Sequence, residues 1–347
     1  MKNNDIVWVD FIRVVASFFV VLVHAAAPLL YRYNSISILN WWTGNAYDSA
    51  ARICVPLFFI TTGYLLLEKQ ETVKDYFTKR INKILIPLIV WSVLYIFWQR
   101  YIENGEPVSF RTFYSLFLSP AYFHLWFFYA IIGLYLYIPI LRILIQYSPK
   151  ELLYYFIALW FIAVSVIPFT EKVTHITSLI DLNMISGFVG YLVIGYIFGN
   201  IQINKKQSIQ ALFVALVCLI ITMAGTFFLT ARNNGEYNGY FYDYLSPNVI
   251  LYSTAAFILL KYIAENTTIF SNQKKILKAL SSASFGIYLI HPMILFGLRA
   301  GWFGFSLSAL SMNAIYSVPL TVFFTFGLSF LIVFLLQKIP FIRNFVP

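Results

Sequence analysis

Long apolar segments recur along the whole chain, and they constrain its fold more than any other feature. The stretch LLYYFIALWFIAVSVIPF (152–169) contains no charged residue, and a helix of about 20 such residues crosses the hydrocarbon core of a bilayer. Only 11% of the 347 residues are charged, whereas a soluble domain carries about a quarter. Membrane barrels alternate apolar and polar residues in short segments, unlike these runs. We therefore expect an all-α integral membrane protein whose residues 1–347 form one transmembrane domain.

The apolar pattern predicts about ten membrane spans, which alternate with short polar loops. With the N-terminus in the cytoplasm, sixteen of the 24 Lys and Arg residues fall in cytoplasmic segments, seven in outer ones, and Arg13 within a span. This bias follows the positive-inside rule, so both termini should be cytoplasmic. The net charge of +10 then reflects topology and indicates no nucleic-acid partner. The predicted spans are 7–30, 46–67, 84–100, 123–145, 152–169, 185–200, 209–231, 247–264, 280–299 and 313–337.

The first span could in principle be a cleaved signal peptide, because Ala25 and Ala27 match the small residues of a cleavage site. Pro28 would follow the cut, however, and the polar start of the chain carries Asp5 and Asp10 beside a lone Lys2. We expect the span to be retained.

Motifs for several other kinds of chemistry are absent from the sequence. There is no phosphate-binding or dinucleotide glycine loop, no nucleophile elbow and no zinc-spaced cluster. Cys54 and Cys218 both fall inside predicted spans, where thiols usually behave as small apolar groups. We expect neither a disulfide framework nor a metal site.

The first span, FIRVVASFFVVLVHAA at 11–26, contains two groups that hydrocarbon penalises, Arg13 and His24. Eleven residues make about three helical turns plus roughly 20°, so both side chains share one helix face, about 16 Å apart along the axis. Asp10 lies three residues before Arg13 and can pair with it. Arg13 could instead snorkel to the headgroups, and His24 could simply bridge two helices.

Two further groups of polar residues lie near the predicted outer surface. Asp48 and Arg52 are spaced i, i+4 on a helix. Arg52 is either an interfacial anchor or a cationic clamp for a polar ligand. His124 and Trp126 open the fourth span, where they could belong to an aromatic belt or contact a ligand.

The ninth span carries a polar stripe in SASFGIYLIHPMILF (282–296). Ser284, Tyr288 and His291 follow the i, i+4, i+7 spacing, and Pro292 kinks the helix beside them. The stripe could bind this helix to its neighbours, or it could line a cavity near mid-membrane.

Taken together, these residues resemble the membrane-bound acyltransferase family 3, in which an arginine or lysine and a histidine flank ten residues in the first span. Arg13 and His24 match that pattern. Within the family the chain is most similar to the stand-alone O-acetyltransferases, such as the enterobacterial common antigen enzymes. Thr62 departs from the serine that the family often has before the glycine. The segments that carry the resemblance are DSAARICVPLFFITTGYLLL (48–67), FHLWFFYAIIGLYLYIPIL (123–141) and SFGIYLIHP (284–292).

The resemblance implies transfer of an acetyl group from cytoplasmic acetyl-CoA to a hydroxyl of a cell-envelope glycan or lipid-linked oligosaccharide. It also implies that the protein lies in the cell inner membrane, in contact with membrane lipids. Histidine suits the role of general base because its unperturbed pKa lies near 6.5. We expect His24 to be the base, or to carry the acetyl group covalently, and Arg13 to help receive the CoA end near the cytoplasm. Residues expected at the CoA are Arg13, Asp10, Tyr288 and His291. Residues expected at the acceptor are Asp48, Arg52, His124 and Trp126.

A transporter or glycolipid flippase is the competing function, because it would also explain ten spans, polar groups at mid-membrane and a kinked helix. We find no half-to-half repeat in the sequence, which argues against it. A purely structural membrane subunit would leave the four ordered motifs unexplained. The acceptor sugar, its hydroxyl and the oligomeric state stay open.

Overall fold

A computed structural model of the chain describes residues 6–105, 107–114, 116, 118–178, 182 and 187–346. In this part of the chain every regular element is a helix, and no strand occurs. The predicted all-α fold is confirmed. The α-helices are α1 (Val7–Leu30), α2 (Ile38–Ala51), α3 (Cys54–Leu67), α4 (Val73–Arg80), α5 (Ile86–Tyr101), α6 (Phe110–Tyr114), α7 (Trp126–Tyr147), α8 (Lys150–Phe161), α9 (Ile167–Thr174), α10 (Val189–Gly199), α11 (Lys205–Arg232), α12 (Pro247–Asn266), α13 (Thr268–Asn272), α14 (Lys274–Arg299) and α15 (Ala314–Leu336).

Nine helical segments within the described ranges are long and apolar enough to cross a membrane, so the chain is a multi-pass membrane protein. The predicted spans 7–30, 123–145, 209–231 and 313–337 agree with these segments to within four residues at both ends, and the segments at 152–169, 247–264 and 280–299 are longer than predicted by up to seven residues at one end. The second span differs, because it begins at Ile38 and is interrupted by a turn at Arg52 and Ile53, between α2 and α3. The third is also longer, since α4 joins α5 through the π-helical turn η1 (Ile81–Leu85).

The helix in the span predicted at 185–200 is shorter than predicted. Its described part is α10, whose eleven residues extend about 16 Å at 1.5 Å per residue, half of the bilayer core. Residues 185 and 186 lie outside the described residues. Nine of the eleven residues of α10 are buried against the rest of the protein. The segment is therefore apolar because protein surrounds it, a composition that hydropathy cannot distinguish from lipid exposure.

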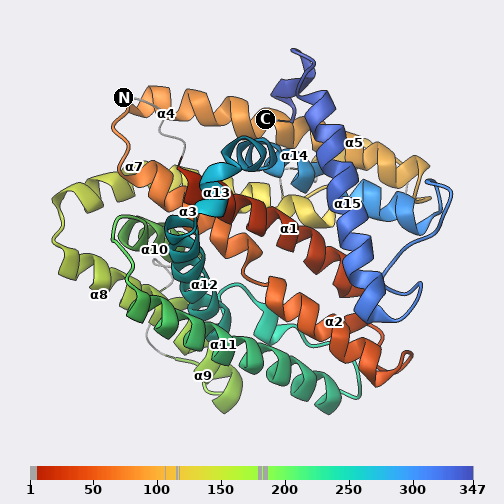
Figure 1. Cartoon of the computed structure of the whole chain (residues 1–347), viewed down its shortest axis with the longest axis horizontal. Coiled ribbons are helices and arrows are strands. Elements are labelled where there is room, and N and C mark those ends of the chain that lie inside the picture. Colours follow the sequence, from red (N-terminus) through yellow and green to blue (C-terminus); the bar gives the residue numbers. More distant parts are fainter. Residues whose placement is uncertain are drawn as a thin grey trace.

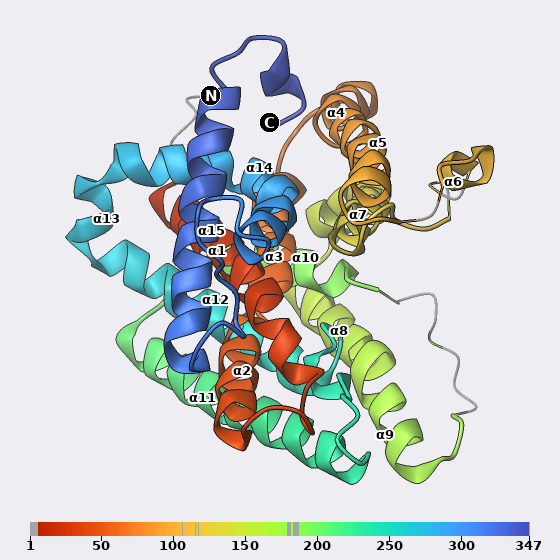
Figure 2. The ribbon, with the colours of Figure 1, turned by 90° about the vertical axis from the view of Figure 1, so that its right-hand side faces the viewer.

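Helix α1 lies at the centre of the bundle, as Figures 1 and 2 show. It packs against α2, α3, α12, α14 and α15. Its first turns meet the start of α14, where the Ser281 hydroxyl donates to the Asp10 carboxylate (2.6 Å). The Gln337 side chain, after α15, donates to the Ser282 carbonyl (3.1 Å). The start of α1 and the end of α15 thus share one end of the molecule (Figure 2), which we call the termini end. That this end faces the cytoplasm stays a prediction.

Helices α3 and α10 cross in direct backbone contact, and glycines permit it. A Cβ atom on Gly195 would lie 1.8 Å from the Ile60 carbonyl oxygen, and one on Gly63 would lie 2.0 Å from that of Leu192. Neither carbonyl can move without distorting its helix. Gly63, in the motif TTGY, therefore serves close helix packing, and α3 is held in place by α10 along its length.

We predict that Gly195→Ala destabilises the protein by at least the 1–3 kcal/mol that overpacking typically costs, because its methyl group would enter the α3 backbone. Gly133→Ala in α7 is the matched control, since a Cβ there meets nothing within 4 Å. Thermal unfolding of both variants in the same detergent checks the prediction. Equal unfolding temperatures for the two variants would contradict it.

Candidate active site

A large cavity of about 470 Å³ opens among α1, α3, α7 and α14. Its walls are mostly apolar, with Tyr288 and Ser284 of α14 on one side. The basic groups among its lining residues come from the first half of α1, the loop after α3, and the segment from α4 to η1. These five, which we call the basic rim, are Arg13, Lys69, Lys79, Arg80 and Lys83. A cavity with clustered cations and apolar walls suits a ligand that is anionic at one end and uncharged along the rest.

A small cavity of about 30 Å³ adjoins the large one. Val20, Val55, Phe127 and Tyr288 line both cavities, so the two cavities are neighbours. Its other lining residues are Val23, His24, Cys54, His124, Trp126 and Tyr244. Helix α1 thus places Arg13 on the large cavity and His24 on the small one, with Val20 between them on the same face.

Three of the four histidines of the chain lie together: His24 and His124 line the small cavity, and His291 packs against both rings. The His24 and His291 rings are stacked, with centroids 5.1 Å apart and planes 23° apart. The His124 ring meets His291 edge-on, with centroids 5.5 Å apart. No group of three His, Cys, Asp or Glu side chains in the described part of the chain is arranged to hold a metal ion. The cluster brings together imidazole rings from α1, α14 and the turn before α7.

Backbone contacts fix the protonation of His291 and the position of His124. The His291 Nδ1 lies 2.7 Å from the Tyr288 carbonyl oxygen, so Nδ1 carries the proton and Nε2 keeps its lone pair. That Nε2 and both ring nitrogens of His124 are buried without a hydrogen-bond partner among the described residues. The Tyr288 hydroxyl donates to the His124 carbonyl and so joins α14 to the start of α7. Buried unpartnered nitrogens are costly, and of these two residues His124 lines the small cavity.

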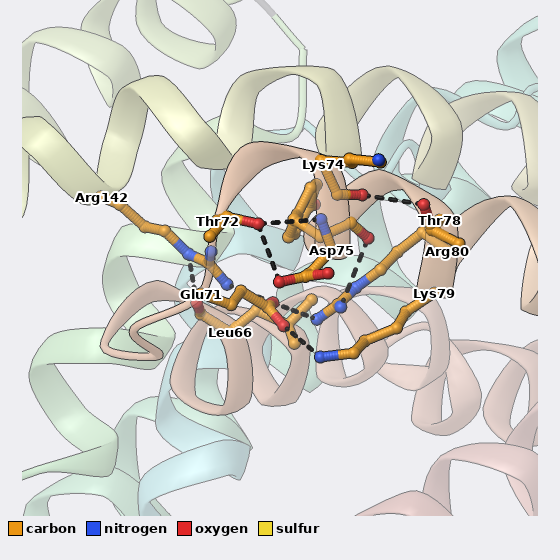
Figure 3. A network of polar contacts seen from close by, with 10 residues as sticks. Leu66, Glu71, Thr72, Lys74, Asp75, Thr78, Lys79, Arg80 and Arg142 are labelled. Atoms are coloured by element: carbon orange, nitrogen blue, oxygen red, sulfur yellow. Dashed lines mark hydrogen bonds and ion pairs between the residues drawn. The ribbon is translucent and has the colours of Figure 1, made fainter.

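Part of the basic rim is held by one carboxylate, that of Glu71 (Figure 3). Its oxygens accept from Arg80 (3.0 Å), Arg142 (3.0 Å) and Lys79 (3.2 Å). The two guanidinium groups also lie over the Tyr76 ring, with centroid distances of 4.4 and 4.8 Å. Glu71 thus fixes Arg80 and Lys79 at the cavity and joins α4 to α7.

The charges around Glu71 change its acidity. Burial alone would raise its pKa, but hydrogen bonds from Arg142 and Lys79 and the positive charges of Arg80 and Arg142 lower the pKa to about 2. Glu71 is therefore ionised at every physiological pH.

Asp48 and Arg52 form the predicted i, i+4 pair, and the Arg52 Nε donates to Asp48 at 2.6 Å. The Arg52 guanidinium lies 4.3 Å from the centroid of the Tyr242 ring. Neither Asp48 nor Arg52 lines the two cavities described above. The pair sits beside the turn between α2 and α3, next to Cys54 on the small cavity.

Two expectations about the site need correction. Asp10 and Arg13, both described, form no ion pair within 4.0 Å, because the Asp10 carboxylate accepts from Ser281 while Arg13 lines the large cavity. His291, expected beside the donor, does not line the large cavity and instead stacks on His24. Tyr288 lines both cavities. His124 and Trp126 lie together on the small cavity.

Sequence reasoning missed several residues of the site. The residues of the basic rim other than Arg13 entered the sequence predictions only through the positive-inside bias. The cluster KRINK (79–83), directly before an apolar span, was a usable signal for a basic site. Tyr244, which no motif singled out, lines the small cavity and stacks on Trp126, with centroids 5.7 Å apart. Cys54 also lines this cavity, and no sequence signal distinguished it from a lipid-facing thiol.

Comparisons with known proteins indicate the family of this chain. The family described as "Acyltransferase domain" matches residues 6–337. The chain is also similar to proteins named "Probable poly-beta-1,6-N-acetyl-D-glucosamine export protein" from Staphylococcus aureus strains MSSA476, MRSA252 and N315. It is 26% identical to each of them over 267 residues, which cover 71% of this chain and 69% of each relative. No solved structure is significantly similar to this chain.

We predict that the Glu71 cluster stabilises the fold at neutral pH and weakens in acid. Because the folded pKa of about 2 lies below the ordinary value of 4.5, the stabilisation is complete above about pH 4.5 and is lost as the pH falls toward 2. Unfolding temperatures of wild type and Glu71→Gln should differ at pH 7 and converge through this window. A difference that stays constant from pH 7 to pH 3 would contradict the prediction.

Proposed function

This chain belongs to the acyltransferase family, and from that premise we propose that it transfers an acetyl group from acetyl-CoA to a hydroxyl of a cell-envelope glycan or lipid-linked oligosaccharide. The single observation that carries the proposal is the pair of adjoining cavities, one with a basic rim and one beside His24. We place the protein in the cell inner membrane with the termini end in the cytoplasm, where acetyl-CoA is available.

The large cavity has the size and chemistry for the donor. Its volume of about 470 Å³ lies within the range of small-molecule sites, about 300–1,000 Å³. CoA carries phosphates at one end and an uncharged pantetheine arm that ends in the thioester. In our scheme the basic rim binds the phosphates, and the arm follows the apolar wall toward Tyr288. Arg13 and His24 lie about 16 Å apart along α1 at 1.5 Å per residue, a separation comparable to an extended arm.

His24 acts as the general base in this scheme. It takes the proton of the acceptor hydroxyl as the hydroxyl oxygen attacks the thioester carbonyl carbon. The carbon–sulfur bond breaks, and the proton passes from His24 to the departing sulfur, so the products are the O-acetyl ester and free CoA. His291, stacked on His24, is proposed to position the base. No proton is gained or lost overall, and no oxidant or metal is needed.

The acceptor is proposed to arrive from the end opposite the termini. The stacked Trp126 and Tyr244 rings border the small cavity, and aromatic faces suit the apolar faces of sugars. The name of the staphylococcal relatives refers to poly-N-acetyl-glucosamine, which supports a glycan as the acceptor. Arg52 is proposed to contact the glycan near this entrance, and the fully buried Asp48 is proposed to hold Arg52 in position.

We predict that His24→Asn reduces acetylation of the surface glycan in cells by about 10²-fold or more, the usual contribution of a general base. His175→Asn is the matched control, because His175 is exposed at the end of α9 with φ 58°, a backbone conformation that asparagine tolerates. Mass spectrometry of envelope glycans at matched protein levels measures the effect. Unchanged acetylation in the His24→Asn cells would remove His24 from catalysis.

Polysaccharide export without acyl transfer is the second candidate, and the printed name of the relatives favours it. The two functions differ in the ligand that the basic rim should bind. An acyltransferase must bind acetyl-CoA, whereas an exporter has no reason to do so.

We predict that the purified protein binds acetyl-CoA, and that Lys83→Gln raises the Kd by about 3- to 10-fold, because loss of a hydrogen bond to a charged group costs about 1.5 kcal/mol or less at an exposed rim. Lys74→Gln, on α4 but not among the cavity residues, should leave the Kd unchanged. Calorimetry at two salt concentrations provides the measurement. Absence of binding by the wild type would favour export.

A further inference from the structure

We infer that the small cavity is an acyl chamber that limits the transferred group to about two carbons, with Val23 and Cys54 as the residues that set its size. The inference rests on the proposed function, since it assumes a CoA thioester in the large cavity. It adds a specificity that follows from the volume and lining of the small cavity.

The volume of the small cavity sets the limit. A cavity needs about 10–15 Å³ to hold one water molecule, so about 30 Å³ holds two to three atoms of that size. The methyl carbon, carbonyl carbon and carbonyl oxygen of an acetyl group reach this limit. A butyryl chain, with two further methylenes, does not fit unless the walls move.

The lining excludes charged acyl groups as well. None of the ten lining residues of the small cavity is Lys, Arg, Asp or Glu, whereas the large cavity has its five cations. A dicarboxylic acyl group such as succinyl would bury a carboxylate without a free cationic partner, because Arg52 beside the cavity is already paired with Asp48, and this is unfavourable. His24 is in the same lining, so an acyl carbon held here lies beside the base.

The side chains of the small cavity that would have to move for a longer acyl chain are stiff. Val20, Val23 and Val55 are β-branched and restricted at χ1, and they project from α1 and α3. Val23 and Cys54 are 6% and 1% exposed, and they line the small cavity but not the large one. Shortening either side chain therefore enlarges the chamber without changing the site for the pantetheine arm.

The test measures binding of CoA, acetyl-CoA, butyryl-CoA and succinyl-CoA to the purified full-length protein in lipid nanodiscs. We expect wild type to bind butyryl-CoA at least about 10-fold more weakly than acetyl-CoA, since one methylene in a shaped pocket is worth about 10- to 200-fold. Succinyl-CoA should be disfavoured at least as strongly. Val23→Ala should lower the ratio of the butyryl-CoA Kd to the acetyl-CoA Kd by about 3-fold or more. The ratio of the succinyl-CoA Kd to the acetyl-CoA Kd should stay high.

Val21→Ala is the matched control, because Val21 is a fully buried valine of the same helix that lines neither cavity. Its ratios should equal those of wild type. If Val23→Ala fails to fold, as judged by gel filtration, Cys54→Ala carries the test with the same expectation.

The outcomes separate the two proposals. If no CoA compound binds, the proposed function fails. If all acyl-CoA compounds bind wild type equally, the chamber is overturned while the acyltransferase function stands. The assignment of the size limit to Val23 and Cys54 is overturned if Val23→Ala and Cys54→Ala leave the ratio of the butyryl-CoA and acetyl-CoA Kd values unchanged. It is also overturned if Val21→Ala changes this ratio as much as they do.

Discussion

A guanidinium and an imidazole on one membrane helix must avoid hydrocarbon, and the arrangement of this bundle follows from that constraint. Helix α1 satisfies it by lying at the centre of the molecule (Figure 1), where five other long helices shield it from lipid. Its polar face then meets cavities instead of acyl chains. Because Arg13 and His24 are eleven residues apart on that face, the same helix reaches both cavities and fixes their separation.

The two cavities differ in the forces they can apply to a ligand. At the large cavity the cations are long side chains, and Glu71 restrains Lys79 and Arg80 through ion pairs, so less ordering entropy remains to be lost when an anion binds. At the small cavity the walls are valines and aromatic rings packed among helices. The α3–α10 crossing, in which Gly63 and Gly195 leave no space, holds the Val55 wall in position. In the proposed scheme the large cavity attracts the ligand by charge, and the small cavity selects it by shape.

Much of the fold could be predicted from hydropathy, because lipid contact imposes a length and an apolar composition on each span. The prediction for α1 agrees with the observed bounds, Val7–Leu30. Hydropathy predicted a longer helix at α10, because burial in protein and exposure to lipid both favour apolar residues. The pairing of Asp10 with Arg13 was plausible from spacing, but Ser281, 271 residues away in sequence, takes the carboxylate. A competitor so distant in the chain cannot be found from local spacing.

The sequence by itself determined that this is a helical membrane protein, that Arg13 and His24 share a face, and that it resembles an acyltransferase family, because each depends on local composition, helical period or ordered motifs. Only the tertiary structure decided that three histidines meet, that Cys54 and Tyr244 border the small cavity, and that a basic rim surrounds the large one. These features join residues from separate helices. Their positions follow from how the helices pack, and packing is a property of the whole chain.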